Sequence, residues 1–155
     1  MTAPDPLTTA WTSAQVEVMH ALRDWALGFA ELNRGFAAWM RLPASDADAL
    51  GRIIWAAEAG SPLSPVQLAR GIGMTTGATT ALVNRLEAAG HVGRSREHPD
   101  RRRVTLRPSP EARHRAREFL AVAGTGIAAT LQAADPAVLR ATTEFLGRMT
   151  AAAAG

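Results

Sequence analysis

The segment from residue 73 to residue 107, GMTTGATTALVNRLEAAGHVGRSREHPDRRRVTLR, constrains the fold most strongly. Its first part has the apolar spacing of a helix over residues 76–89, and Gly90 is placed to end that helix. Two β-prone runs follow at 92–95 and 102–107, separated by a turn that contains Pro99 and Asp100. The segment therefore predicts a helix that leads directly into a short hairpin.

A second helix is predicted just before this segment. Ser64 is followed by Pro65 and, three residues after the serine, by Gln67, which is a start signal for a short helix. Residues 71–73 then supply a glycine-rich turn. Two short helices joined by a turn and followed by a hairpin have the layout of a winged helix-turn-helix. In such a unit the second helix presents its N-terminal half to DNA base edges.

The remaining sequence is predicted to be helical. One long helix spans 13–40, and Ser45 with Asp48 forms a capping-box signature for another over 46–59. A long helix is expected from about 110 to 134, and Asp135 with Pro136 opens a final one. The fold class is therefore mainly α with a small β-wing, a winged helix-turn-helix flanked by N- and C-terminal dimerisation helices.

The helix over 13–40 carries an unbroken a/d stripe of apolar residues. Its members are Val18, Leu22, Trp25, Phe29, Leu32, Phe36 and Trp39. We interpret this helix as the core-facing helix of a larger bundle, with a coiled coil as the alternative. The terminal helices must bury apolar faces, and packing on each other and on a second copy achieves this. Residues 1–42 and 110–155 are thus expected to form a homodimer around a DNA-binding lobe at 43–109.

The charge of the chain is concentrated in one segment. All 17 basic residues are Arg, and the net charge of the whole chain is only +3. Residues 85–117 contain ten Arg and four acidic residues, a local net charge of +6. A basic patch on a mildly acidic body indicates a localised contact with a polyanion such as double-stranded DNA.

The helix over 76–89 has two predicted faces. Ala78, Leu82 and Leu86 recur every four residues and are expected to face the core. The face left for DNA carries small, neutral side chains over the first two turns of the helix, with Thr79 at its margin. Its predicted contact residues are Thr76, Gly77, Thr79, Thr80, Asn84 and Arg85. An ordinary surface helix is the alternative interpretation.

The hairpin supplies the positive charge that this helix lacks. Arg101, Arg102 and Arg103 lie at or just after the bend, and arginine suits narrow minor grooves and phosphates. Strand alternation would send Arg102 to one side and the other two arginines to the opposite side. We expect Asp100 to hold the tip by pairing with a neighbouring arginine. A hairpin with no DNA contact is the alternative.

These residues together resemble the MarR family of winged-helix transcriptional regulators. The matching pieces are PLSPVQLARGIGMTTGATTALVNRLEAAGHVGR, the wing PDRRRVTL and the SPEAR start of the next helix. The resemblance implies a dimer formed by interlocked terminal helices, recognition-helix roles for Thr76, Gly77, Thr80 and Arg85, and wing roles for Arg101 and Arg102. Many relatives carry Lys and Arg on the recognition helix, whereas this chain has Thr76 and Ala81. Because the chain has no Cys, thiol sensing is excluded.

Relatives in this family often bind small aromatic effectors between the dimerisation helices and the DNA-binding lobe. The side chains that are candidates for such a pocket are Trp25, Phe29, Phe36, Trp39 and Trp55, with core packing as the alternative. Glu111, His114 and Glu118 share one helix face, but exposed helices often carry such sets, and we predict neither a metal nor a cofactor.

The sequence therefore predicts a cytoplasmic homodimer that binds a pseudo-palindromic operator and acts as a repressor, released by a small-molecule effector. The alternative is a constitutive DNA-binding or protein-interaction module with the same fold. No Ser-His-Asp motif, phosphate-binding glycine loop or HExxH motif indicates an enzyme. The N-terminus lacks signal-peptide features, and the longest uncharged run is too short to cross a bilayer.

Overall fold

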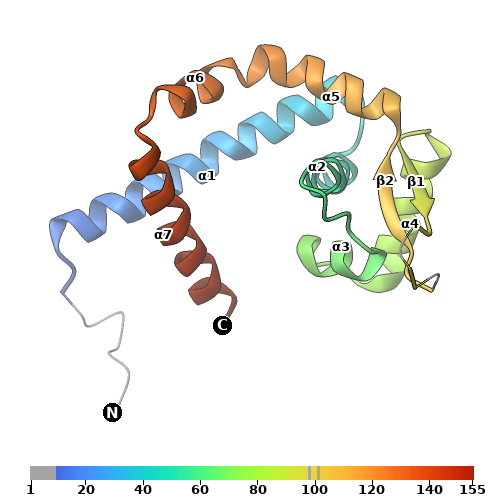
Figure 1. The fold of residues 1–155 in the computed structure, drawn as a ribbon, viewed down its shortest axis with the longest axis horizontal. Helices are drawn as coiled ribbons and strands as arrows, with labels where there is room; N and C mark the ends of the chain where they lie inside the picture. Colours follow the sequence, from blue (N-terminus) through green and yellow to red (C-terminus); the bar gives the residue numbers. More distant parts are fainter. Residues whose placement is uncertain (1–9, 98, 101) are drawn as a thin grey trace. The chain divides into compact units, whose positions relative to one another are not determined.

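The computed structural model describes residues 10–97, 99–100 and 102–155. This part of the chain contains seven helices and one antiparallel pair of strands (Figure 1). The predicted fold class, mainly α with a small β-wing, is confirmed. The contacts divide the chain into two compact units, the first ending at Arg113 and the second running from His114 to Gly155.

The first unit begins with α1 (Ser13–Met40), whose bounds agree with the predicted helix. Thr12 caps the helix by accepting a hydrogen bond from the backbone N–H of Gln15, and the Gln15 side chain accepts one from the Thr12 backbone. Only Ala37 and Met40, at the C-terminal end, are buried. Most of the apolar stripe, including Trp25 and Phe29, is exposed on the single chain.

Helix α2 (Ala44–Glu58) begins two residues earlier than predicted. Pro43 is its N-cap and provides no side-chain cap. The predicted capping box of Ser45 and Asp48 is therefore wrong, because both residues lie inside the helix. The Ser45 hydroxyl donates to the Asp46 carboxylate, and the Asp48 carboxylate accepts from Arg52.

Helices α3 (Pro65–Ile72) and α4 (Thr76–Ala88) confirm the predicted helix-turn-helix. Ser64 and Gln67 form the expected capping box. Gly73 ends α3 with a φ of 66°, a left-handed conformation that favours glycine. The side chains packed between α2, α3, α4 and the sheet form a core of fully buried residues, which includes Leu50, Ile53, Leu68, Leu82, Leu86 and Leu106.

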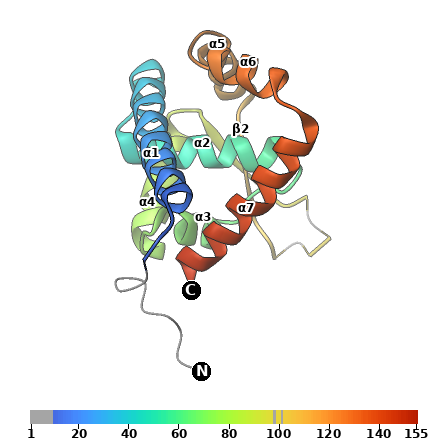
Figure 2. The same cartoon turned by 90° about the vertical axis from the view of Figure 1, so that its left-hand side faces the viewer.

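Strands β1 (Val92–Ser95) and β2 (Thr105–Pro108) form the wing. Their antiparallel register pairs Val92 with Pro108 and Ser95 with Thr105. The backbone N–H of Leu106 donates to the carbonyl of Leu63, at 2.8 Å, and so fastens β2 to the segment before α3. The described part of the connection between the strands projects beyond α2, α3 and α4 (Figure 2).

Three helices follow the wing: α5 (Pro110–Ala123), α6 (Thr125–Ala133) and α7 (Pro136–Ala154). The predicted single helix over 110–134 is wrong, because it is divided at Gly124. The hydroxyl of Thr125 donates to the Ala121 carbonyl, one turn back, and such bonds compete with the helix ladder. Asp135 caps α7 as predicted. Among the described residues, no helix is both long and apolar enough to cross a membrane.

Candidate nucleic-acid interface

The first two turns of α4 present small side chains to solvent. Thr76, Gly77, Thr80 and Ala81 are all exposed. A Cβ added at Gly77 would meet no atom within 4 Å, so the helix surface is open at this position. The predicted reading face is therefore accessible at the residues nearest the N-terminus of α4.

Thr79 belongs to the core and not to this face, which corrects the sequence prediction. It is 1 % exposed, and its hydroxyl donates to the carbonyl of Thr75 at 2.9 Å. Ala78, predicted to face inward, is exposed instead. The buried stripe follows the spacing of Thr79, Leu82 and Leu86, which is closer to the helical repeat of about 3.6 residues than steps of four.

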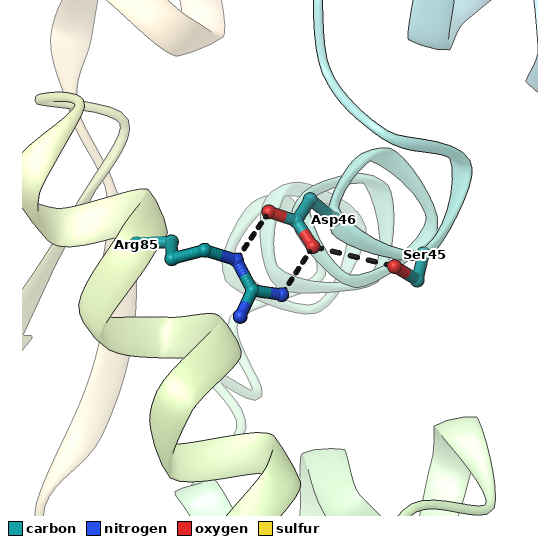
Figure 3. Close-up of polar contacts among 3 residues, drawn as sticks. All are labelled: Ser45, Asp46 and Arg85. Atoms are coloured by element: carbon teal, nitrogen blue, oxygen red, sulfur yellow. Dashed lines mark hydrogen bonds and ion pairs between the residues drawn. The ribbon is translucent and has the colours of Figure 1, made fainter.

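Arg85, in the last turns of α4, is held by a carboxylate from α2 (Figure 3). Its Nε donates to Oδ2 of Asp46 at 3.1 Å, and its Nη2 donates to Oδ1 at 2.8 Å. The Asp46 side chain is 4 % exposed, whereas that of Arg85 is 56 % exposed. The hydrogen bond to Asp46 raises the pKa of Arg85 above its usual value, with partial desolvation opposing and the negative charge reinforcing this shift.

Asn84 is also bonded within the protein. Its side-chain oxygen accepts from Nη2 of Arg94, on β1, at 2.9 Å. Nη1 of the same arginine pairs with Oε2 of Glu87 at 2.5 Å. Bidentate reading of adenine needs both the oxygen and the nitrogen of an asparagine amide. Here the oxygen is already engaged, and Arg94 joins α4 to the wing.

The tip of the wing is shaped by Asp100. Its carboxylate accepts from the backbone N–H of Arg102 at 3.0 Å, and its carbonyl accepts from that of Arg103 at 2.9 Å. Asp100 thus orders the tip through two backbone donors, and its predicted pairing with an arginine side chain stays a prediction. The turn therefore includes Arg102, and β2 begins only at Thr105. The predicted strand alternation does not apply to Arg102 and Arg103, which precede β2, and Arg101 lies outside the described residues.

At the base of the wing, arginine pairs with acidic side chains. Nη2 of Arg107 lies 2.9 Å from Oε2 of Glu97, across the hairpin. Nη2 of Arg113 lies 2.6 Å from Oε1 of Glu58, which ties the start of α5 to the end of α2. The ten arginines of residues 85–117 therefore do not all add to the positive surface.

The aromatic side chains predicted for an effector pocket occupy different environments. Phe36 packs against the core of the first unit. Trp25 and Phe29 stack on each other along α1, with ring centroids 5.8 Å apart. Both are exposed, as are Trp39 and Trp55. Four of the five rings therefore lie on the surface of the single chain, and their role in effector binding stays a prediction.

The side chains considered for a metal site form a simple pair. Nε2 of His114 lies 3.3 Å from Oε1 of Glu118, one helical turn away. Within the described ranges, no group of three or more His, Cys, Asp or Glu side chains is placed to hold a metal ion.

Comparison with known proteins identifies the lobe that contains these elements. A model of the MarR family matches residues 43–103. The lobe at residues 43–103 therefore matches the MarR family of winged helix-turn-helix, DNA-binding transcriptional regulators. Members of the MarR family regulate transcription and are not enzymes, which agrees with the absence of catalytic motifs from the sequence. A Bacillus subtilis relative, the uncharacterized HTH-type transcriptional regulator YcgE, is 49% identical over 51 residues, 33% of this chain. The match spans 32%, about a third, of that relative.

Solved structures with the same fold extend the likeness beyond this lobe. The transcriptional regulator BldR from Sulfolobus solfataricus is 26% identical, with a TM-score of 0.58, over 90% of this chain and 99% of that one. A MarR family protein from Bacillus stearothermophilus has a TM-score of 0.62 and 20% identity, over 94% and 100% of the two chains. A Staphylococcus aureus MepR variant, solved bound to an oligodeoxyribonucleotide, has a TM-score of 0.51 and 12% identity over 92% and 99%.

Asp46 is the residue of this site that sequence reasoning missed. It precedes Leu50 by four residues and Ile53 by seven, so it lies on the buried stripe of α2. A carboxylate on an apolar stripe requires a cationic partner, since an unpaired buried charge is costly. That pattern signals a buried ion pair, although the sequence does not identify Arg85 as the partner.

Proposed function

We propose that this protein binds double-stranded DNA as a homodimer and represses transcription from a pseudo-palindromic operator. The observation that carries the proposal is the pairing, within one unit, of an exposed, neutral α4 N-terminus with an arginine-bearing wing. The first supplies a surface that fits a major groove, and the second supplies cations for phosphates and the adjacent minor groove. The fold of MepR, which carries an oligodeoxyribonucleotide in its solved structure, supports the proposal.

The exposed apolar stripe of α1 supports the homodimer. Val18, Trp25 and Phe29 are uncovered on the single chain, and a second copy provides a self-complementary cover. In this arrangement residues 1–42 and 110–155 form the dimer, and residues 43–109 bind DNA. Two-fold symmetry places the half-sites about 10 base pairs apart, or a multiple of that distance.

The affinity of the dimer comes mainly from the wing, because the first two turns of α4 carry no charged side chain. Base discrimination by Thr76, Gly77 and Thr80 is then modest, and counterion release makes binding strongly dependent on salt. A small aromatic effector, bound beside the exposed tryptophans, releases the operator. The protein acts in the cytoplasm.

Selection of bound duplexes from a random pool tests this function directly. We expect an enriched, pseudo-palindromic sequence, bound by a species with twice the monomer mass in sedimentation. Phe29→Asp, on the apolar stripe of α1, should yield monomers that lose operator binding. Arg23→Asp, on the charged face of the same helix, is the control. A monomeric wild-type protein at micromolar concentration, or a pool without enrichment, contradicts the proposal.

A thermal-shift screen of small phenols and benzoates tests the effector, which must also weaken DNA binding.

A further inference from the structure

We propose that Arg85 is a positioning residue. With buried Asp46, it fixes the C-terminal half of α4 to the first turn of α2, so that the N-terminal half meets DNA at a set angle. The inference rests on the proposed function, and it reassigns an arginine that the sequence places among the DNA contacts.

The geometry of the pair fixes orientation as well as distance. Two parallel hydrogen bonds join the guanidinium of Arg85 to both carboxylate oxygens of Asp46 (Figure 3). A bidentate arginine–carboxylate pair resists rotation, whereas a single bond does not. Asp46 also accepts from the Ser45 hydroxyl, at 3.3 Å. Its place in the first turn of α2 favours a negative charge, because the helix dipole is positive there.

Because Asp46 is buried, its carboxylate needs a cationic partner. The residue is only 2 % exposed, so its charge has little access to water. Because an unpaired buried carboxylate is costly, Arg85 cannot leave it for a phosphate without a replacement partner. The carboxylate also cancels most of the charge that Arg85 would offer to DNA.

A second attachment holds the neighbouring residue of α4. Asn84 bonds to Arg94 of β1, and Glu87 bonds to the same side chain. The C-terminal half of α4 is thus tied to α2 on one side and to the wing on the other. In the first two turns, the hydroxyl of Thr80 donates to the carbonyl of Thr76, in the same helix.

Charge substitutions distinguish a positioning role from a phosphate contact. In Asp46→Asn the cation is released, so a phosphate-binding Arg85 would bind operator and random DNA more tightly. A positioning Arg85 instead loses its anchor, and the ratio of operator affinity to random-DNA affinity falls by about tenfold. Arg85→Gln should lower that ratio similarly, with an unchanged salt slope on random DNA. Arg85→Lys keeps the charge but not the two-bond geometry, so it should fail to restore the ratio.

Three results would overturn the proposal. They are tighter operator binding by Asp46→Asn, a salt slope that falls by about 0.9 for each Arg85 removed, and wild-type selectivity in Arg85→Lys. Each would show that Arg85 contacts phosphates. Retained binding of random DNA, with an unchanged far-ultraviolet circular dichroism spectrum, verifies that each variant is folded. If the single variants unfold, the same DNA-binding measurements are made on the double variant Asp46→Asn with Arg85→Gln, which forms a neutral amide pair.

Amide hydrogen exchange tests the anchor without any DNA. Peptides from α4 should exchange faster in Asp46→Asn than in the wild type, while peptides from α7 should not change. Unchanged exchange in α4 would refute the positioning role even if the wild type binds its operator. A wild type that binds no DNA would refute the proposed function, and the exchange measurement would still decide whether the pair holds α4.

Discussion

The two halves of α4 differ in what their side chains contact. In the first two turns, exposed side chains are small and neutral, and the hydroxyl of Thr80 bonds to its own helix. In the last turns, Asn84, Arg85 and Glu87 all bond to other elements of the same unit. One helix of 13 residues therefore combines an open surface with an anchored one. The open half suits a groove, and the anchored half determines how that surface is presented.

The wing shows the same division between its tip and its stem. The stem arginines, Arg94 and Arg107, pair with Glu87 and Glu97. At the tip, the Asp100 turn orders the backbone of Arg102. The number of arginines in this segment therefore overstates the positive charge available to DNA, because several of them hold the lobe together.

The largest effect is expected at the wing tip. Changing Arg101 and Arg102 together to Ala should weaken operator and random DNA alike, because phosphate contacts carry no sequence information. Counterion release predicts a salt slope lower by about 1.8 for each engaged wing, which corresponds to about a 60-fold loss of affinity at 0.1 M salt. Fluorescence anisotropy over a salt series measures both quantities. Loss of operator binding alone would show that the tip reads sequence.

A smaller, selective effect is expected at the stem. Arg94→Met removes the bridge between α4 and β1 and should lower operator affinity several-fold more than random-DNA affinity. Arg96→Met removes the same charge from a neighbouring exposed position and is the matched control. Since the Arg94–Glu87 pair is partly exposed, its removal should cost less than about 1 kcal/mol of folding free energy. Equal effects of the two variants on both DNAs would mean that Arg94 acts only through its charge.

Two adjacent threonines test the boundary between reading face and core. Thr80→Val removes an exposed hydroxyl but keeps a methyl group, so we expect a few-fold loss of operator selectivity with little change in stability. Thr79→Val alters a buried hydroxyl that bonds to Thr75, so we expect a change in unfolding free energy of about 1 kcal/mol and unchanged DNA binding. Urea denaturation and operator titration measure the two effects. The reverse pattern would contradict the assigned faces.

The smallest effect is expected at Gly77. Alanine should stabilise α4 by about 0.5–1 kcal/mol, because glycine weakens helices and the added Cβ meets no other atom. If DNA approaches the backbone at this position, the same methyl group should weaken operator binding a few-fold. Higher thermal stability with unchanged affinity would remove Gly77 from the reading face.

Local signals predicted most of the fold. The capping box at Ser64, the glycine after α3 and the Asp135 cap each depend on residues within one turn of each other, so the sequence alone contains them. The apolar periodicity of α1 likewise gave its bounds. The predicted start of α2 was wrong because Ser45 and Asp46 do not bond to the end of the helix. The Ser45 hydroxyl bonds to Asp46, whose carboxylate is also bound by the distant Arg85.

Contacts between distant residues explain the errors at the site. Asp46 and Arg85 are 39 positions apart, and no local pattern pairs them. Thr79 was assigned to the margin of the reading face because steps of four residues drift by about 40° per step from a helical stripe. Strand β2, which contains Leu106, begins later than predicted because the turn at Asp100 extends to Arg103. In each case the decisive partner is determined by packing.

The Arg94 bridge also has a consequence for the shape of the DNA that this lobe accepts. With α4 and the wing stem joined, the spacing between the proposed major-groove and minor-groove contacts is fixed before the duplex arrives. A duplex whose groove widths suit that spacing binds without deformation, whereas another duplex must bend or twist, at a cost that depends on its sequence. Base pairs that no side chain contacts then contribute to selectivity through their stiffness.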